Sequence, residues 1–405
     1  MPFSLEKPLV SVVVINFNYG QFIAEAIQSL KDQSYERFEC LIVDNNSSDD
    51  SVAIVTREII SDSRFKLQRL EQNLGHLGGM LFVLDQLKGD FVTFLDADDV
   101  LLPNFLVSHI QVHLSTAFST GFTSSNAIEV NAEAAQVSSG NGMVYAAWRD
   151  GSPSLRPLAQ VTRLAGVSRS DYLHLDDATR YVGALVRGWN WSPGSANMFR
   201  RALLDRLRPH VPAGSPLFGG VDGYYMPMMH AISGSNIINL PLLAYRIHGR
   251  NDYTGMASIV GGRIGTERGI AQGFQIQNLI LITMIERCER LPIYRAAFWQ
   301  SFTTVANLNH LYEPCREPEV VAAITDQYNI LMQYFGERVL IRELYQLLSF
   351  KNLLQITLLS RTGWQKVRAG CYLLRAGLRF NLRRIFFLAR TIVIRLIGRR
   401  TSSPA

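Results

Sequence analysis

Apolar runs and amphipathic segments alternate through the first hundred residues of the chain. The runs are rich in Val, Ile, Leu and Phe, recur at nearly constant intervals, and span residues 9–16, 38–44, 65–70 and 91–96. The segments between them carry apolar residues three and four positions apart, as amphipathic helices do, and span residues 21–30, 49–60 and 76–87. A continuous apolar run of this kind is typical of a strand buried on both faces. The repeat therefore predicts a parallel sheet made of βα units with right-handed crossovers.

The pattern is less regular after residue 100. We expect a helix over 103–114 with Pro103 in its first turn, where proline is favoured. Segment 131–172 is rich in Gly, Ser and Ala, which predicts loops or an insertion. Segments compatible with further strands occur at 118–130 and 239–249, and segment 194–207 is compatible with a strand or turn followed by a helix. From about Thr266 to Phe350 the spacing is helical again, so the sequence predicts an α/β fold with a mostly parallel sheet flanked by helices, followed by a helical C-terminal region.

The charge is distributed unevenly along the 405 residues. The formal net charge is +6, yet residues 351–405 contain 12 Lys and Arg and no Asp or Glu, so the rest of the chain is mildly acidic. Wound as a helix, residues 381–400 of this tail have arginines over about half of the circumference and aliphatic side chains opposite, the pattern of a helix that lies in a membrane interface. Its uncharged runs are too short to span a bilayer. The sequence predicts that the tail binds an anionic membrane surface, with packing on the body or in an oligomer as the alternative. The aliphatic content argues against nucleic acid as a partner.

Composition and cysteine usage narrow the class of protein. With 47% hydrophobic and 18% charged residues, the chain has the make-up of a globular protein. The four cysteines are far apart and match neither zinc-site spacing nor a disulfide framework, and the N-terminus lacks the features of a secretory signal. We therefore expect a cytoplasmic protein that is peripheral on the inner face of the plasma membrane.

Polar or glycine-rich residues follow each of the four predicted strands. They are "NFNYG" (16–20), Asp44 with "NNSSDD" (45–50), "QNLGHLGG" (72–79) and "DADD" (96–99). Ligands of open parallel sheets bind outside the carboxyl ends of the strands, because loops and helix N-termini meet there. These segments are therefore expected to lie close together and to form the binding site.

Missing motifs restrict the ligand. No G-x-G-x-x-G follows the first strand, no G-x-x-x-x-G-K-[ST] is present, and "NFNYGQFI" has no basic residue for a phosphate-binding loop. What remains is a nucleoside diphosphate bridged by a divalent cation, because hard cations share carboxylate ligands with substrate phosphates. Asp96 and Asp98 suit this purpose, since side chains two apart in an extended segment point to the same side.

Several segments together resemble a known family. "VSVVVINFNYGQFIAEAIQSL", "CLIVDNNSSDDS", "QNLGHLGG" and "FVTFLDADDVLLP" are similar to the GT-A fold of family 2 inverting glycosyltransferases. "WSPGSANMFRRALL", "FGGVDGYYMPMM" and "LPLLAYRIHGRND" resemble its acceptor-side segment, the position of its catalytic acid and its closing motif. The resemblance covers roughly residues 9–251. It implies a catalytic domain over 1–260, with a nucleotide-sugar half over about 1–118 and an acceptor half over about 119–260, then a helical domain over 261–350 and the basic tail over 351–405.

The resemblance also assigns roles to residues at matching positions. Asp222 matches the general base. Nucleotide binding falls to Asn16, Asn18, Asp44, Gly75 and Asp96. A Mg²⁺ or Mn²⁺ ion would be held by Asp98, Asp96 and His248. The implied donor is a UDP-, dTDP- or GDP-linked sugar, and the implied acceptor is a glycan or a polyprenyl-lipid-linked glycan in bacterial surface polysaccharide synthesis. The oligomeric state stays open.

The sequence departs from the family pattern at a few positions. Asn45 stands where a second acid is usual, Met80 and Leu81 replace an Arg-Asn pair, and Asp222 has no acidic neighbour. Two other functions therefore stay open. One is a nucleotidyltransferase that makes the activated sugar, and the absence of a basic loop counts against it. The other is a non-catalytic GT-A-like partner protein in a membrane complex.

Some residues have a structural interpretation beside the functional one. Asp99 fits a helix cap, because carboxylates are favoured at helix N-termini. His109 and His113 have ligand-like spacing but no third ligand, which favours ordinary surface or core histidines. Trp189 and Trp191 fit either sugar stacking or the core. The glycines of "QNLGHLGG" allow close backbone approach, either to a ligand or to a neighbouring element.

Overall fold

The computed structural model describes residues 6–164, 166–212, 214–251, 266–307, 315, 317–348, 352, 353 and 356. Contacts divide the chain into two compact units, Met1–Pro314 and Cys315–Ala405. The sheet and the helices that cover it belong to the first unit, so the residues that matter for function are described within that unit.

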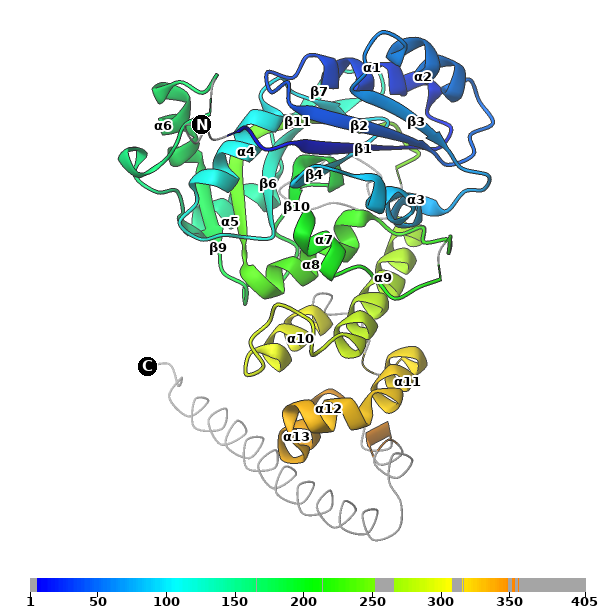
Figure 1. Ribbon diagram of the computed structural model, residues 1–405, viewed down its shortest axis with the longest axis vertical. Coiled ribbons are helices and arrows are strands. Elements are labelled where there is room, and N and C mark those ends of the chain that lie inside the picture. Colours follow the sequence, from blue (N-terminus) through cyan, green and yellow to red (C-terminus); the bar gives the residue numbers. More distant parts are fainter. Residues whose placement is uncertain are drawn as a thin grey trace, which may run out of the picture. The chain divides into compact units, whose positions relative to one another are not determined.

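One mixed sheet of eleven strands forms the centre of the first unit (Figure 1). Its main path has the order β3-β2-β1-β4-β10-β6-β11-β9-β8, while β5 pairs with β11 and β7 pairs with β6. The strands are β1 (Val10–Asn16), β2 (Phe38–Asp44), β3 (Phe65–Arg69), β4 (Phe91–Asp96), β5 (Val100–Leu101), β6 (Phe122–Asn131), β7 (Gln136–Ser138), β8 (Ser152–Pro153), β9 (Thr179–Val182), β10 (Asn197–Arg200) and β11 (Ser235–Ile247). The first four strands pair in parallel, as the βα repeat predicts.

The second half of the sheet mixes strand directions. The short strand β10 runs antiparallel between β4 and β6, whereas β6 and β11 are parallel to each other. Four residues of β10 are too few for a periodic signal, so the sequence locates this strand only approximately. The predicted fold class, a mostly parallel sheet flanked by helices and followed by a helical C-terminal region, is confirmed.

Helices cover the parallel strands on both faces. Alternate residues of β1, among them Val12 and Val14, pack in one core cluster with Ile23 of α1 (Gly20–Lys31), Val55 of α2 (Ser51–Ile59) and Ile110 of α4 (Phe105–Ser115). Helix α3 (Gly75–Val83) lies against β1 and β2 on the other face (Figure 1). Since β1 is buried along its whole length, its continuous apolar run is explained by burial on both sides.

Two details expected for the middle of the chain are wrong. Of the two alternatives for segment 131–172, loops or an insertion, loops alone are excluded, because the segment contains helix α5 (Gly142–Asp150) and the start of helix α6 (Arg169–Ala178) besides β7, β8 and the 3₁₀ turn η2 (Leu158–Gln160). Each helix has a local start signal: Asn141 caps α5, and Ser168 and Asp171 form a capping box on α6. Helix α4 begins at Phe105 after the N-cap Asn104, so Pro103 precedes the helix instead of standing in its first turn.

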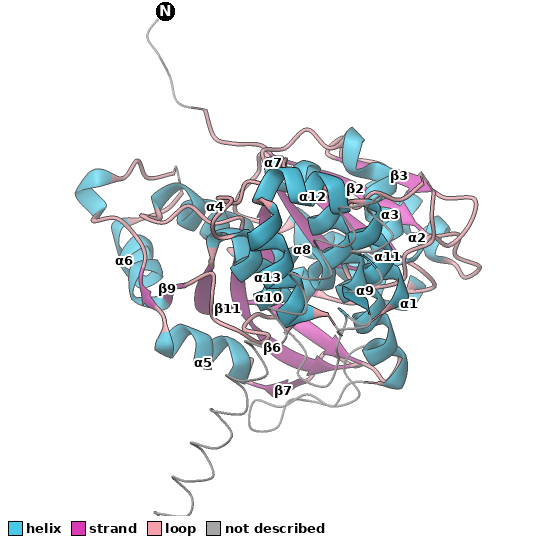
Figure 2. Ribbon diagram, turned by 90° about the horizontal axis from the view of Figure 1, so that it is seen from below, coloured by secondary structure: helices cyan, strands magenta, loops and turns pink. Residues whose placement is uncertain are grey.

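Four helices follow on the second face of the sheet. They are α7 (Arg201–Arg206), α8 (Val221–Ser233), α9 (Glu267–Glu286) and α10 (Phe298–Ala306), with the 3₁₀ turns η1 (Leu84–Gln86) after α3 and η3 (Gly194–Ala196) before β10. Helices α8, α9 and α10 contact one another, and α8 also contacts β6 (Figure 2). This packing places the N-terminus of α8 beside α3.

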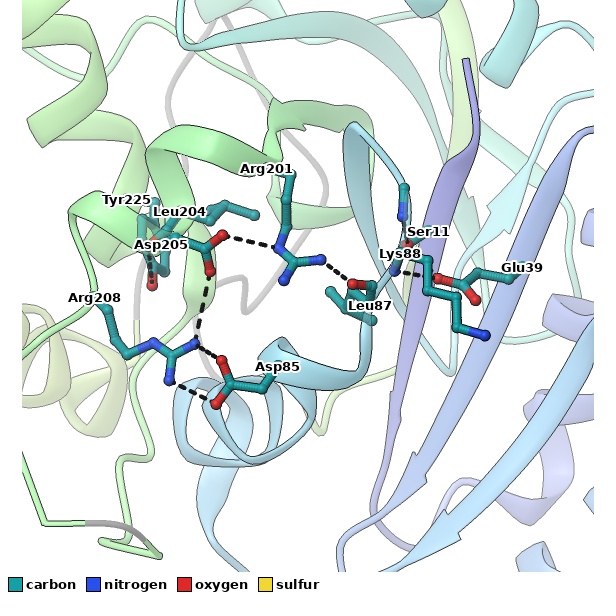
Figure 3. A network of polar contacts seen from close by, with 11 residues as sticks. Ser11, Glu39, Asp85, Leu87, Lys88, Arg201, Leu204, Asp205, Arg208 and Tyr225 are labelled. Carbon is teal, nitrogen blue, oxygen red and sulfur yellow. Dashed lines mark hydrogen bonds and ion pairs between the residues drawn. The ribbon is translucent and has the colours of Figure 1, made fainter. Parts of the chain in front are cut away.

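A polar network joins α7 to the turn before β4 (Figure 3). The guanidinium of Arg208 donates to both carboxylate oxygens of Asp85, at 2.6 and 3.0 Å. Arg201 binds Asp205 at 3.1 Å and also donates to the backbone oxygen of Leu87. A single exposed ion pair contributes little, but a bidentate pair within a network contributes more. The network therefore links α7 and the segment that follows it to the turn before β4.

In the second unit the described residues form α11 (Pro318–Asp326), α12 (Tyr328–Phe335) and α13 (Glu337–Leu347). Among the described residues, no helix is both long enough and apolar enough to cross a membrane. The predicted basic tail over 351–405 lies outside the described residues, apart from 352, 353 and 356.

Candidate active site

A cavity of about 930 Å³ opens where the carboxyl ends of the central strands meet α3, α8 and α9. Asp96, Asp98 and Asp222 line it, although Asp222 is more than a hundred residues away from the other two in the sequence. Apolar residues of α9, among them Ile276 and Ile280, form another part of the wall. The cavity therefore combines a carboxylate cluster with an apolar surface, which suits a ligand that has both polar and apolar parts.

The acidic turn after β4 holds three carboxylates close together. Ligand oxygens of Asp96, Asp98 and Asp99 all lie within 4.8 Å of one another. Burial raises the pKa of Asp98, and burial together with Asp98 and Asp96 raises the pKa of Asp99 well above its usual range. Placing these charges side by side is costly unless a cation compensates them, so the donor set fits a hard divalent ion.

Arg246 of β11 holds the acidic turn in place. Its backbone N–H donates to Asp99 Oδ1 at 2.9 Å and its Nε donates to the backbone oxygen of Asp98 at 2.8 Å. The side chain is 1% exposed, stacks over Phe22 and pairs with Glu25. Asp99 therefore bonds to β11 and does not cap α4, which begins six residues later.

His248 contacts Asp98 directly. Its Nδ1 accepts a hydrogen bond from the backbone N–H of Arg250 at 3.2 Å, and its Nε2 lies 2.7 Å from Asp98 Oδ2. A ring nitrogen that accepts from N–H carries no proton, so in the neutral ring the proton is on Nε2 and is donated to Asp98. In this arrangement His248 orients a carboxylate of the acidic turn.

His76 makes the corresponding contact with Asp96, and sequence reasoning did not find it. Its Nε2 lies 2.7 Å from Asp96 Oδ1, and its Nδ1 accepts from the backbone N–H of Val221 at 3.1 Å. A signal was present in the sequence, because His76 is the sole titratable residue in α3, whose other residues are glycine or apolar. A polar residue in such a helix needs partners when it is buried.

Asp222 stands in the first turn of α8, where the helix dipole favours a carboxylate. Burial raises the pKa of its carboxyl, while His76 opposes the rise. Gly194 approaches closely: a Cβ there would lie 3.5 Å from Asp222 Cγ. Asp222 is thus a carboxylate at the cavity wall whose pKa is shifted toward the range that suits a general base.

Asn16, Asn18 and Asp44 form a separate polar cluster at the ends of β1 and β2. Asn16 Nδ2 donates to Asp44 Oδ1 at 2.9 Å, and the Ser47 N–H donates to Asp44 Oδ2 at 3.0 Å. Asn18 has φ +58° and its Oδ1 accepts from the Ser48 N–H at 2.8 Å. Asp44 is 1% exposed. Asn16, Asn18 and Asp44 do not line the cavity, whereas the loop residue Asn45 does.

Asn45 connects this cluster to α3. Its Nδ2 donates to the Gly75 backbone oxygen at 3.1 Å and its Oδ1 accepts from the Leu74 N–H at 3.4 Å. A carboxylate cannot donate, so the amide is the side chain that suits this position. The departure from the family pattern therefore has a structural reason here.

The glycines of α3 allow approach to a neighbouring element. A Cβ on Gly75, which has φ +74°, would lie 2.5 Å from the Leu217 backbone oxygen, and one on Gly78 would lie 3.0 Å from that of Ser215. Gly75 also lines the cavity. Of the two interpretations offered for these glycines, backbone packing is confirmed at Gly75 and Gly78.

The structure also locates the two tryptophans, Trp189 and Trp191, and the two histidines, His109 and His113. Trp191 is 1% exposed and donates to Ser235 Oγ, so it belongs to the core, whereas Trp189 lines the cavity. His109 and His113 are buried and bond to Thr123 and to the backbone of Met198. Burial lowers the pKa of His109 to about 3. Both histidines are core residues.

Comparison with known proteins relates the first part of the chain to one family. Residues 11–121 match the family model described as Glycosyl transferase family 2. Over 106 residues the chain is 40% identical to the GalNAc(5)-diNAcBac-PP-undecaprenol beta-1,3-glucosyltransferase of Campylobacter jejuni, covering 26% of this chain and 34% of the relative. Over 115 residues it is 33% identical to the UDP-Glc:alpha-D-GlcNAc-diphosphoundecaprenol beta-1,3-glucosyltransferase of Escherichia coli, covering 28% of this chain and 45% of the relative.

A longer match extends past the family model. Over 250 residues the chain is 25% identical to a glycosyltransferase of Nostoc, covering 62% of this chain and 68% of the relative. The chain spans less than half of the length of the two glucosyltransferases. The parallel half of the sheet and the acidic turn after β4 lie inside the segment that the family model matches.

Proposed function

We propose that the chain acts as a family 2 glycosyltransferase, transferring a sugar from a nucleoside diphosphate donor to an acceptor hydroxyl with inversion at the anomeric carbon. The match of residues 11–121 to the family model and the likeness to two glucosyltransferases support this proposal. The single observation that carries this proposal is the cavity in which Asp96, Asp98 and Asp222 converge from β4 and α8. A donor diphosphate and an acceptor hydroxyl would then have separate carboxylate partners within one enclosed space.

Asp222 would act as the general base. Its carboxylate accepts the proton of the acceptor hydroxyl while that oxygen bonds to the anomeric carbon and the bond to the diphosphate oxygen breaks, its electron pair leaving with the diphosphate. The raised pKa of Asp222 supports this role, because a general base works best when its pKa approaches the working pH. Inversion follows from a single displacement, and it needs no nucleophilic residue on the protein.

The acidic turn would hold Mg²⁺ or Mn²⁺. Asp96 and Asp98 would hold the ion, and the hydrogen bonds that His76 and His248 make to these carboxylates would orient them toward it. When bound, such an ion neutralises charge that develops on the departing diphosphate. His248 would act through Asp98 in the arrangement observed, and its direct ligation stays a prediction.

The nucleotide would lie beside the ends of β1 and β2. Asn16, Asn18 and Asp44 shape the loop there through their mutual bonds, and their direct contact with the base or ribose stays a prediction, as does that of Gly75. Arg250 and Arg268 add cationic side chains to the cavity lining. A UDP-, dTDP- or GDP-linked sugar fits this proposal.

The acceptor would enter along α9. Apolar side chains of this helix and of Phe218 line the cavity on the side of Asp222, which suits a glycan carried on a polyprenyl lipid. The two relatives named for undecaprenol-linked acceptors support this choice. Synthesis of a bacterial surface polysaccharide at the inner face of the plasma membrane would follow.

The basic tail would hold the enzyme at an anionic membrane. We expect deletion of residues 351–405 to release the protein from vesicles that contain anionic lipid, since each basic residue near such a surface contributes about 1 kcal/mol. Flotation of the full chain and of the truncated chain measures this, with neutral vesicles as the control. Flotation of the truncated chain with anionic vesicles would refute the role of the tail.

Asp222→Asn tests the proposed chemistry. The amide fits the site but is no base, so kcat should fall by about 10² to 10⁴. Donor affinity, measured by calorimetry with sugar nucleotides and Mn²⁺, should stay within twofold of the wild-type value. The anomeric configuration of the product, read by NMR, checks inversion. Transfer by this variant at the wild-type rate would remove Asp222 as the base.

A further inference from the structure

We propose that His76 is a positioning residue that ties Asp96 to the N-terminus of α8, and so sets the placement of the general base relative to the donor site. The inference rests on the proposed function of the cavity. His76 does not need to touch either substrate for this role, because it acts through the two groups that its ring nitrogens bind.

Both nitrogens of the ring have one defined partner. Nδ1 accepts from the Val221 N–H at 3.1 Å, which requires a lone pair on that nitrogen. The proton of the neutral ring is therefore on Nε2, which donates it to Asp96 Oδ1 at 2.7 Å. One planar ring thus fixes the distance between the end of β4 and the residue directly before Asp222.

The contact with Val221 replaces a missing helix cap. The first N–H groups of a helix have no partner inside the helix. In α8 the N-cap residue is Gly220, which has no side chain to accept a hydrogen bond. His76 supplies the acceptor from another helix, so the orientation of the first turn of α8 depends on α3.

The backbone of α3 is already joined to the segment before α8. The Leu77 N–H donates to the Gly219 oxygen at 3.1 Å, and the Gly78 N–H donates to the Leu217 oxygen at 3.2 Å. In return the Leu217 N–H donates to the Leu74 oxygen at 2.7 Å. These bonds fix the segment, and His76 extends the connection from it to the acidic turn.

The two contacts can be separated by substitution. In His76→Gln the amide nitrogen can reach the place of Nε2, so the bond to Asp96 is kept and the bond to Val221 is lost. In His76→Asn the amide oxygen can take the place of Nδ1, so the bond to Val221 is kept and the bond to Asp96 is lost. His76→Leu removes both, and the exposed His210→Gln serves as the control.

We expect the variants to affect different kinetic constants. His76→Gln should lower kcat about tenfold or more with little change in the KM for the donor, because a hydrogen bond that holds the base in place is lost. His76→Asn should raise the KM for the donor about tenfold or more and affect kcat less. His76→Leu should show both effects, and the control should show neither.

Hydrogen exchange provides a measure that does not depend on turnover. Exchange in the peptide that covers the start of α8 should speed up in His76→Gln and His76→Leu but not in His76→Asn. If the wild-type protein transferred no sugar at all, the proposed function would fail, whereas exchange and donor affinity would still decide the role of His76. Folded His76→Leu protein with wild-type exchange and wild-type kinetic constants would overturn the proposal, and so would identical effects of the Gln and Asn variants.

Discussion

The first unit has two polar clusters along one edge of its sheet, one around Asp44 and one around Asp96 and Asp98. The two clusters differ in how their negative charge is compensated. Asp44 is enclosed by donors from its own neighbourhood, Asn16 Nδ2 and the Ser47 N–H. Asp96 and Asp98 lie against the cavity; Asp96 is bound by His76, 20 residues before it, and Asp98 by His248, 150 residues after it. The first group is complete without a ligand. The second retains a surplus of negative charge, which marks it as the place where a cation and a diphosphate would add stabilising interactions.

This difference distinguishes a cluster with a structural role from a cluster with a role in ligand binding. A closed cluster makes its hydrogen bonds within the protein, so it keeps a loop in one conformation without a ligand. In the open cluster burial and the neighbouring Asp96 raise the pKa of Asp98, an unfavourable situation for its charged form that a cation relieves, and such shifts are common in functional sites. Substitutions in the two groups should therefore change different quantities, and this expectation can be tested.

The largest effect is expected for Asp98→Ala. Loss of a direct ligand should weaken Mn²⁺-dependent nucleotide binding by more than the about 10- to 100-fold that removal of an outer partner costs. Calorimetry with a nucleoside diphosphate, with and without Mn²⁺, measures it, and the exposed Asp150→Ala is the matched control. Equal affinity of the Asp98 variant and the wild type in Mn²⁺ would show that the open cluster binds no metal.

A large pH effect is expected from Asp222. Its pKa is raised by burial, so the active carboxylate form is lost on acidification at a higher pH than for an ordinary aspartate of pKa about 3.9. In a pH profile, kcat/KM should fall about tenfold per pH unit below this raised pKa. Full activity maintained down to pH 4 would contradict the assignment.

A moderate effect on stability should distinguish Asp44 from Asp98. In Asp44→Asn one amide oxygen faces two donors, so one buried donor loses its partner and unfolding should become easier by about 1–3 kcal/mol. In Asp98→Asn the oxygen still accepts from His248, and a buried negative charge is removed, so stability should change less. Urea unfolding of both variants measures the difference, and equal losses would contradict the comparison.

The smallest effect concerns a core histidine outside both groups. His109 has a pKa of about 3 when folded, against about 6.5 when unfolded, so the unfolded chain binds more protons between these values. Its contribution to the free energy of unfolding is present above pH 6.5 and is lost as the pH falls toward 3. Between pH 7 and 5.5 the loss is about 1 kcal/mol. Urea unfolding of the wild type and of His109→Gln at both pH values should show a shallower loss in the variant. An equal loss in both proteins would show that His109 does not titrate as a buried neutral group.

Much of the fold could be predicted because its signals are local. The βα repeat gave strands within one or two residues of β1 to β4, since burial on both faces requires continuous apolar runs. The short strand β10 was located only approximately, and the helices within 131–172 were not predicted. Ser168 and Asp171 are a capping signal for one of these helices, α6. Asp96 and Asp98 were proposed from their spacing at the end of a predicted strand and Asp222 through the resemblance, and the three do share one cavity.

His76 and Arg246 were not predictable in the same way. Val221, which His76 binds, is 145 residues away in the sequence, and the Asp98 backbone that Arg246 holds is 148 residues away. Periodicity reports which face of an element is buried, but it does not report which distant side chain completes a hydrogen bond there.

The sequence by itself therefore determined the parallel sheet, the edge at which polar residues gather and the acidic turn at the end of β4. Each of these follows from local spacing and from the burial that it requires. The tertiary structure decided which carboxylates are enclosed and which face the cavity, and it paired Asp96 with His76 and Asp98 with His248. These outcomes depend on the contact of α3 with α8 and on the pairing of β11 with β5, the strand that directly follows the acidic turn. Hydrogen bonds between separate segments form only where such packing brings their atoms within reach.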